Sequence, residues 1–463
     1  MKLEVKWQAF IIVSIGIFMS TLDGSILNIA NPTLAKSFQI SMQQVQWIVT
    51  AYMLIITASL IFLGRLGDRI GSDKIYAAGF IIFTLGSLLC SISPSFALLI
   101  GSRLVQGIGA SMMMATGMGI ISNTFPPQER GKALGLTGMI VGFGNMTGPS
   151  LGGFLVAHFA WPVIFLINVP IGLLGFYLAL RFLPKQTRNQ DLHGYDLPGT
   201  LIFALIIGLF IYTLSGAEKI SITLLLIALL LIMAFYYIEK KSRQPMLELE
   251  LFKIKNFVYG NIMALGIYVT QTTVFFLLPF YMESILKLSP SFTGLLMTIT
   301  PVSMAITAPL AGTLSDKIGS RKILSVSLLT ATGAYVVFST LNGQLSLVKL
   351  VCGLALLGIG MGMFGSPNNS SIFASIPREK AGYGGGFIAT VRNLSFAIGI
   401  AGSVSIFSIV LSASQKTMAY NNAYIHASNT VYQIAAGITL MGFIISLLTR
   451  LGGNKTEERE GES

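Results

Sequence analysis

Four ionisable side chains lie inside long apolar stretches of this sequence, and their types could support chemistry there. They are Asp23, Arg103, Glu283 and Arg392. If the stretches cross a membrane, placing each group costs about 2.5–3.5 kcal/mol on insertion scales, so each is a functional candidate by default. Two carboxyl and two guanidinium groups in such a setting favour the binding and release of protons, or of charged cargo.

Asp23 and Arg103 are expected to form a pair. In helices over 8–34 and 96–122, they lie about 16 Å and about 12 Å from the same membrane face, at 1.5 Å per residue. A neighbouring arginine favours the ionised carboxylate and loss of water opposes it, so such a carboxylate can bind and release a proton during a transport cycle. We predict that Asp23 carries the proton and that Arg103 tunes it. The alternative is a fixed ion pair that holds the two helices together.

Glu283 and Arg392 are more ambiguous. Glu283 lies near the end of its stretch, where it either faces external water or serves as a second proton site or a counter-charge for cationic substrates. Arg392, inside its own stretch, leaves the same choice open. The candidate proton-coupling residues are therefore Asp23, Arg103 and Glu283.

Other chemistry is not indicated. His158, His193 and His426 fall in loops or at the ends of apolar stretches, which predicts neither a metal cluster nor a buried histidine relay. No nucleophile–histidine–acid set is apparent, and the lack of a phosphate-binding loop argues against an ATP-driven pump. We expect no enzymatic activity, no metal and no cofactor, with protons as the coupling ion.

The elements that must position these residues are membrane helices. Hydrophobic residues make up 53% of the 463 residues and charged residues 10%, whereas a soluble domain carries about 25% charged residues. The apolar stretches run about 20 residues, as helices require, and lack the alternation of barrel strands over about 10 residues. The sequence predicts an all-α membrane protein with fourteen transmembrane helices, near 8–34, 45–64, 75–93, 96–122, 133–157, 162–183, 197–214, 220–238, 257–284, 292–314, 322–341, 345–370, 383–411 and 429–449.

Basic residues indicate the orientation. Most of the 30 lysines and arginines fall in loops on one side of the predicted helices, and such loops are cytoplasmic. An even number of helices puts both ends of the chain on that side, so we predict a multi-pass cell-membrane protein with both termini cytoplasmic. The net charge of +12 is spread over short loops without a concentrated basic face, which argues against nucleic acid as a partner.

An internal repeat divides the chain into two halves. The segment from Gly64 to Gly71 recurs from Gly312 to Gly319, and the Pro127 segment is echoed at Pro377. We predict a six-helix bundle over 1–190, two inserted helices over 191–245, a second six-helix bundle over 246–450 and a disordered cytoplasmic tail over 451–463. Related halves of this kind place a substrate site at their interface, near the bilayer midplane.

Two segments are candidates for conformational change. A carboxylate in the repeated loop can bind a helix N-terminus in one state and leave it in another, so the candidate latch comprises Gly64, Asp68, Arg69, Gly71, Asp316 and Arg321. The alternative to a latch is that these residues belong to solvated loops whose basic side chains anchor the helices on the cytoplasmic side. The second segment contains Gly144, Gly148, Pro149, Gly152 and Gly153, which indicates either close helix packing or a helix bend on which the halves rock.

In this order the motifs resemble the fourteen-spanner branch of the drug/proton antiporters in the major facilitator superfamily. The resemblance rests on 22–32, 64–74, 99–110, 144–153, 165–172 and 312–322. It implies a major facilitator fold, alternating access and proton import coupled to export. It implies that Asp23 and Arg103 couple transport to protons, that Asp68 belongs to the latch, and that Gly148 and Pro149 bend their helix. Asn31, Pro162, Val163 and Glu283 depart from the usual family residues, as do Ser72 and Asp73.

We therefore expect a multidrug efflux transporter, a proton-coupled antiporter that exports amphipathic and often cationic drugs or toxic compounds. Its partners would be small amphipathic molecules, protons and the lipid bilayer, and the chain is expected to be a monomer. Candidate cavity residues are Asn28, Tyr52, Gln106, Met112, Met113, Tyr268, Phe276 and Arg392, although ordinary packing or lipid contact would also explain most of them. Two alternatives stay open: export of an endogenous lipid, fatty acid or metabolite, and a non-transporting membrane sensor or scaffold.

Overall fold

The computed structural model describes residues 4–185, 197–214, 222–241, 249–377 and 381–448, and every regular element in them is helical. The first bundle and the inserted pair comprise α1 (Val5–Phe38), α2 (Met42–Ile70), α3 (Ser72–Ser91), α4 (Phe96–Thr124), α5 (Pro127–His158), α6 (Val163–Leu166), α7 (Asn168–Phe182), α8 (Leu197–Leu214) and α9 (Ile222–Lys241). A 3-10 turn over Leu249–Lys253 precedes α10 (Lys255–Ser284), α11 (Pro290–Met297), α12 (Ile299–Ile318), α13 (Ser320–Phe338), α14 (Leu347–Ser375), α15 (Ala381–Ser414) and α16 (Tyr420–Leu448). His193 and the predicted tail over 451–463 lie outside the described residues.

A helix lies in each of the fourteen ranges predicted to cross the membrane. Two of them are interrupted, since α6 gives way to α7 at Ile167 and α11 to α12 at Thr298. Within the described residues, ten helical segments are long and apolar enough to span a bilayer, or eleven when the bent pair of segments in α2 is included. The all-α membrane fold is confirmed, and the number fourteen stays a prediction.

Local signals in the sequence explain where several helices begin and end. The Ser41 hydroxyl accepts a hydrogen bond from the Gln44 backbone N–H, and the Gln44 side chain accepts one from the Ser41 backbone N–H, which is a capping box at the start of α2. Gly71, between α2 and α3, has φ of 111°, and Gly319, between α12 and α13, has φ of 90°. Only glycine adopts such values readily, so the two copies of the sequence repeat form the same kind of turn.

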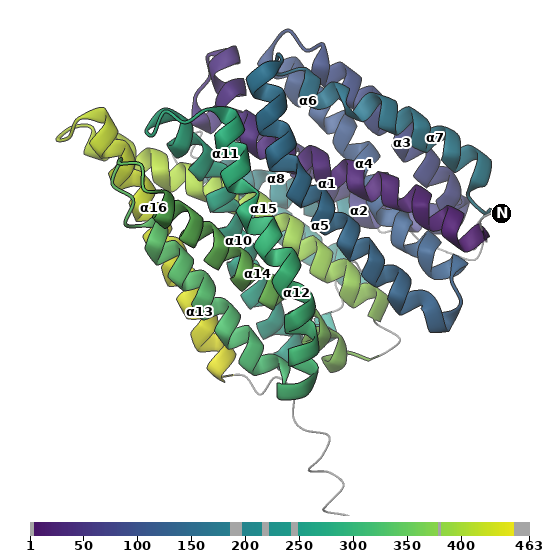
Figure 1. Ribbon diagram of the computed structural model, residues 1–463. Helices are drawn as coiled ribbons and strands as arrows, with labels where there is room; N and C mark the ends of the chain where they lie inside the picture. The colour runs from purple at the N-terminus through teal and green to yellow at the C-terminus, as the bar shows by residue number, and fades with distance from the viewer. Residues whose placement is uncertain (1–3, 186–196, 215–221, 242–248, 378–380, 449–463) are drawn as a thin grey trace, which may run out of the picture.

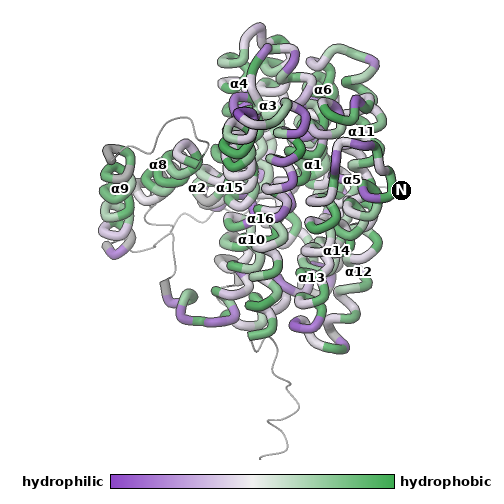
Figure 2. The backbone as a smooth tube through the Cα atoms, turned by 90° about the vertical axis from the view of Figure 1, so that its left-hand side faces the viewer, coloured by the Kyte–Doolittle hydropathy of each residue, from purple (hydrophilic) through white to green (hydrophobic). Residues whose placement is uncertain are grey.

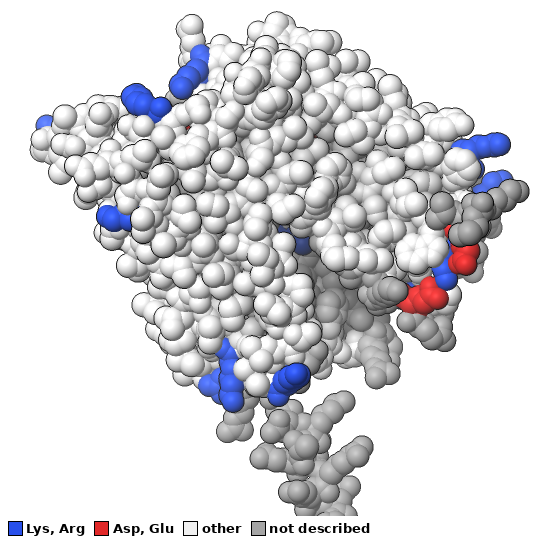
Figure 3. Space-filling model, viewed as in Figure 1, with Lys and Arg blue, Asp and Glu red and all other residues white. Residues whose placement is uncertain are grey.

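The helices form two bundles with the inserted pair at one side. Figure 1 shows α1, α3, α4 and α7 on one side of the molecule and α10, α13, α14 and α16 on the other. Figure 2 shows α8 and α9 beside the main body, where Ile207 and Ile211 of α8 pack with Ala397 and Ala401 of α15. The face in Figure 3 is largely uncharged, as expected of a surface in contact with lipid, with most of its Lys and Arg near the margins and blue atoms also visible in a hollow near the middle.

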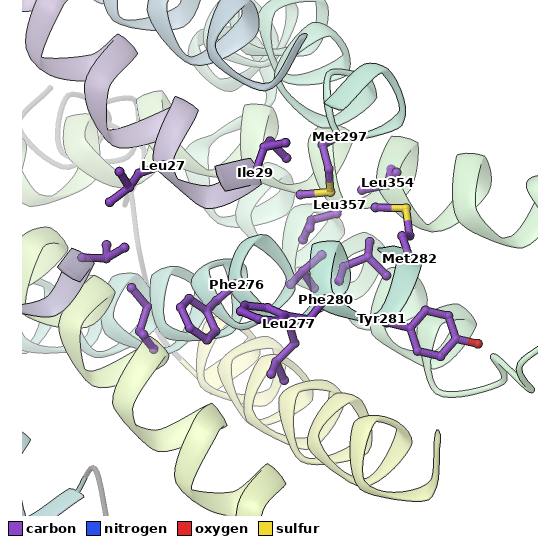
Figure 4. Close-up of a cluster of buried hydrophobic side chains, with 14 of the residues drawn as sticks. Leu27, Ile29, Phe276, Leu277, Phe280, Tyr281, Met282, Met297, Leu354 and Leu357 are labelled. Atoms are coloured by element: carbon purple, nitrogen blue, oxygen red, sulfur yellow. The ribbon is translucent and has the colours of Figure 1, made fainter. Parts of the chain in front are cut away.

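The two bundles share one hydrophobic core at one end of the molecule, called the closed end. Leu27 and Ile29 of α1 lie in the same buried cluster as Phe276 of α10 and Met297 of α11 (Figure 4). Lys36 of α1 also lies at this end, beside the last turn of α10. Burial of apolar surface between the bundles therefore holds them together here.

At the opposite end, called the divergent end, the bundles have separate cores. Ile12 and Phe125 belong to a cluster made of first-bundle helices, whereas Phe257 and Ile376 belong to a cluster near the 3-10 turn, α10, α14 and α15. The helices in Figure 1 meet at the upper left and spread apart toward the lower right. The structure thus captures the two bundles tilted against each other, joined at the closed end.

Small residues allow α5 and α11 to touch at the closed end. A Cβ added to Gly294 would lie 2.2 Å from the Pro149 carbonyl oxygen, and one added to Gly153 would lie 2.5 Å from the Pro290 carbonyl oxygen. The hydroxyl oxygens of Ser150 and Thr298 are 2.6 Å apart across this contact. The backbones of the two bundles are therefore as close as glycine permits.

This contact predicts a cross-link. Cysteines replacing Ser150 and Thr298, in a background with Cys90 and Cys352 changed to alanine, should form a disulfide under mild oxidation, because the two side chains already meet. Resistance of the oxidised protein to a maleimide-polyethylene glycol mass tag measures the cross-link. Each single-cysteine variant should still take up the tag. Continued tagging of the oxidised double variant would show that the closed end is not populated as described.

Candidate functional site

Asp23 of α1 and Arg103 of α4 form a buried ion pair. Arg103 Nη1 donates to Asp23 Oδ2 at 2.7 Å, and the Arg103 and Asp23 side chains are 0% and 1% exposed. Arg103 Nε also donates to the Ile48 carbonyl of α2, at 3.2 Å. The proximity expected from helix depths is confirmed, and the pair joins three helices of the first bundle.

The second carboxylate oxygen of Asp23 is held by two amides. Asp23 Oδ1 accepts from Gln106 Nε2 and from Asn168 Nδ2, both at 2.9 Å. Gln106 Nε2 also donates to Ser87 Oγ at 2.8 Å, and Gln106 Oε1 accepts from Arg103 Nη1. Gln106, a predicted cavity residue, is instead fully buried within this charge network.

Asn168 is a residue whose role the sequence did not assign. It begins α7, directly after Ile167, and its amide donates to the Asp23 carboxylate. The only signal was its position inside the motif over 165–172. A polar residue inside an apolar span is the pattern that indicates it.

Aromatic rings cover the Arg103 guanidinium. Its Cζ atom lies 4.0 Å from the centre of the Tyr52 ring and 5.8 Å from that of Phe165. Desolvated cation–π contacts are worth about 2 kcal/mol. Tyr52, another predicted cavity residue, therefore shields the ion pair in this conformation.

Glu283 lies at the closed end, away from the Asp23 network. Its Oε2 is 4.0 Å from Lys36 Nζ, and its side chain is only 2% exposed. Lys36 is 13 residues beyond Asp23 in α1, or roughly 20 Å along the helix. The expectation that Glu283 faces external water does not fit its burial. The residue instead joins α10 to α1 across the two bundles.

The glycines of α5 serve close packing on two sides. Added Cβ atoms at Gly144, Gly148 and Gly152 would lie 2.1 Å, 1.8 Å and 3.1 Å from atoms of α1, whereas Gly153 faces α11. The Ser25 hydroxyl of α1 donates to the Gly144 carbonyl at 3.1 Å. Because α5 is one continuous helix with Pro149 inside it, a bend at this residue stays a prediction.

The candidate latch residues lie at the two repeated turns of the divergent end. Gly64, Asp68 and Arg69 end α2, and Asp68 is exposed without a hydrogen bond or ion pair to any described residue. Arg321, at the start of α13, donates to the backbone carbonyls of Ser446 and Leu447 in the last turn of α16. The side chain of Asp316 lies outside the described part of the chain.

The other predicted cavity residues are divided between cores and partly exposed positions. Met112 and Met113 pack inside the first bundle, and Phe276 packs in the shared core beside Phe280. Asn28 and Arg392 are half-buried. Met112, Met113 and Phe276 thus pack in hydrophobic cores in this conformation.

Sequence comparison identifies the family of this chain and several relatives. A family model described as Major Facilitator Superfamily matches residues 13–400. The chain is 47% identical over 445 residues to the riboflavin transporter RibZ of Clostridioides difficile (strain 630), covering 96% of this chain and 98% of that protein. It is 30% identical over 412 residues to the multidrug resistance protein Stp of Mycobacterium tuberculosis (strain CDC 1551 / Oshkosh), covering 87% and 76% of the two.

A solved structure shares the fold. It is a bacterial homolog to the human lysosomal transporter Spinster, in an inward-facing and unoccupied conformation. The TM-score is 0.70 at 16% sequence identity, and the match covers 97% of each chain. At this identity the likeness extends to the fold alone.

Substitution of two buried glutamines tests how much the hydrogen bonds of the charge network contribute to the stability of the protein. Gln106→Leu should lower stability by about 3 kcal/mol or more, because it removes hydrogen bonds to two charged groups, each worth about 1.5–3 kcal/mol. Gln46→Leu is the matched control, since Gln46 is about as buried, yet neither of its side-chain polar atoms has a hydrogen-bond partner among the described residues. It should be neutral or stabilising. Denaturant midpoints of the purified variants provide the comparison, and equal losses for both would refute the network as the stabilising feature.

Proposed function

The chain belongs to the Major Facilitator Superfamily, and from this premise we propose that it is a proton-coupled antiporter of planar amphipathic molecules, with riboflavin as the first candidate substrate. Family and fold make it a membrane transporter rather than an enzyme. The coupling to protons, the direction of transport and the identity of the substrate are what we propose. The observation that carries it is the buried carboxylate of Asp23, held beside Arg103 in the middle of a membrane helix.

Protonation of Asp23 would remove the negative charge that balances the Arg103 guanidinium. An ionised Asp23 balances the Arg103 charge, and removal of one member of a buried pair costs about 3–5 kcal/mol. A neutral Asp23 would leave Arg103 without its counter-charge, so α4 and α1 would have to shift or admit water. Binding of a proton would in this way favour a different arrangement of α1, α4 and α7, which is the requirement for coupling.

The contacts at the closed end are those that alternating access has to break. They are the Lys36–Glu283 pair, the Ser150–Thr298 hydrogen bond and the backbone contact between α5 and α11. Because the basic loops predict cytoplasmic termini, we assign the divergent end to the cytoplasm and the closed end to the outside. The described conformation is then the one that loads cargo from the cytoplasm.

Riboflavin is the first candidate because of the 47% identical relative. Its planar ring system and polar side chain make it amphipathic, as the sequence predicts for the cargo. Export of a neutral molecule in exchange for one proton moves one net charge inward, so the membrane potential adds about 2.3 kcal/mol per 100 mV to the pH gradient.

Export of cationic drugs is the second candidate, favoured by the multidrug-resistance relative and by the buried carboxylate of Glu283. It predicts that Glu283→Gln lowers export of the planar cation ethidium several-fold and leaves riboflavin export within twofold. Proteoliposome flux of both compounds measures the ratio. An unchanged ethidium-to-riboflavin ratio contradicts a cargo role for Glu283.

The main proposal predicts the behaviour of Asp23→Asn. In proteoliposomes this variant should exchange labelled riboflavin for unlabelled riboflavin across the bilayer, yet fail to accumulate it against its gradient when a pH gradient is applied. The reason is that asparagine keeps the hydrogen-bonding shape of the side chain and cannot ionise.

Glu129→Gln is the control, because Glu129 is a partly exposed carboxylate that pairs with Lys6 at the surface. It should retain both exchange and accumulation. Full pH-driven accumulation by Asp23→Asn would remove Asp23 from the coupling mechanism.

A further inference from the structure

Arg392 is a cation inside a predicted membrane helix that no described residue neutralises. It lies half-buried in α15, about 17 Å from the start of the helix, and forms no ion pair and no hydrogen bond with a described residue. Arg103, by contrast, has a carboxylate, an amide and a backbone carbonyl as partners. Because an uncompensated charge at such a depth is expensive, its retention indicates a partner that arrives from outside the chain.

Aromatic rings from three helices cluster around Tyr268, and one of them lies one helical turn along α15 from this arginine. The Tyr268 ring of α10 is edge-on to Phe364 of α14, with centroids 6.1 Å apart, and edge-on to Phe396 of α15, with centroids 5.8 Å apart. Phe396 is one helical turn beyond Arg392, so the two share a face of α15. Arg392 is also near enough to the Tyr268 hydroxyl to interact with it electrostatically.

The three helices bring these groups to one depth. Tyr268 lies 13 residues from the start of α10 and Phe364 lies 11 residues before the end of α14, or about 20 Å and about 17 Å from the helix ends on the Arg392 side. Tyr268 and Phe396 are partly exposed, whereas Phe364 is buried behind them. Two aromatic surfaces and one cation thus remain available to a ligand.

Side-chain amide groups near the arginine also lack hydrogen bonds to described residues. Gln271, one helical turn beyond Tyr268 in α10, is half-buried and forms no hydrogen bond in the described structure. Asn393 is 4% exposed, and its Nδ2 atom has no hydrogen-bond partner among the described residues. A buried amide without a partner is costly, so these donors also favour a polar ligand edge at this place.

We propose that Arg392, Tyr268 and Phe396 form the recognition site for a planar heteroaromatic ring whose edge carries carbonyl or anionic oxygen atoms. The guanidinium binds the oxygen-bearing edge, because its planar set of donors matches two acceptors at once. The aromatic side chains contact the ring faces, and Gln271 and Asn393 contribute amide donors and acceptors. The proposal rests on the proposed transport of planar molecules and names the residues that select them.

Fluorescence titration of riboflavin and of lumichrome, which has the ring system without the ribityl chain, tests the site in purified full-length protein in nanodiscs. Arg392→Gln should weaken binding of both compounds by about tenfold or more, because a hydrogen bond to a charged group is lost. Arg392→Lys should weaken binding less, since it keeps the charge and loses the planar geometry. Phe396→Leu should weaken binding about five- to tenfold, as the loss of one stacking ring does elsewhere.

Phe407→Leu is the matched control, because Phe407 lies on the same helix and packs against Tyr424 of α16, away from the site. It should bind both compounds as the unmodified protein does, and thermal unfolding should show that all variants are folded. Undiminished binding by Arg392→Gln and Phe396→Leu overturns the site and leaves riboflavin transport standing. Loss of riboflavin binding with normal lumichrome binding in Arg392→Gln also overturns it, because the arginine would then hold the ribityl chain. Lack of binding of either compound to the unmodified protein overturns both the site and riboflavin as substrate.

Discussion

An ionised carboxylate and a guanidinium cannot stand alone in a membrane interior, and this constraint organises the first bundle. Asp23 and Arg103 meet at 2.7 Å, and their remaining hydrogen-bonding atoms are met largely by Gln106, Asn168 and a backbone carbonyl of α2. Four helices therefore depend on the charge state of a single side chain. In water such a pair would be worth little, but at this burial the loss of either charge is costly for the whole arrangement.

Helix α1 links this charge pair to the contact between the bundles. Asp23 lies in the middle of α1, and residues beside it in the same helix pack on the glycines of α5. At the end of α1, Lys36 lies beside Glu283 of α10. Because glycine allows backbone contact without side chains between, α5 follows α1 closely while its other side meets α11. In the proposed mechanism, Asp23 binds and releases its proton in alternation with cargo, and α1 transmits the change in charge at Asp23 to the closed end, where the two bundles share a core. The second bundle has no equivalent pair among the described residues, and in our proposal its Arg392, which pairs with no described residue, binds the cargo.

Much of this could be predicted from the sequence, for physical reasons that also explain the misses. Long apolar stretches identify membrane helices, the repeated turn at Gly71 and Gly319 relates the halves, and helix rise alone placed Asp23 and Arg103 at one depth. Side-chain direction was harder, because helices that are apolar all round carry little sign of which face is inside. Gln106 and Tyr52 were therefore assigned to a cavity rather than to the charge network, and Met112 and Met113 proved to be packed within the first bundle. The pairing of Glu283 with Lys36 joins residues far apart in the chain, and so does the hydrogen bond from Asn168 to Asp23, which periodicity does not predict.

The central claim is that Asp23 exchanges its proton for cargo, and proton release upon substrate binding tests it most directly. Riboflavin is added to purified, weakly buffered protein while binding is followed by fluorescence and pH by an indicator dye. The account predicts that binding releases protons from the unmodified protein and that Asp23→Asn binds riboflavin without release. Binding to the unmodified protein without proton release, or equal release from Asp23→Asn, would contradict it.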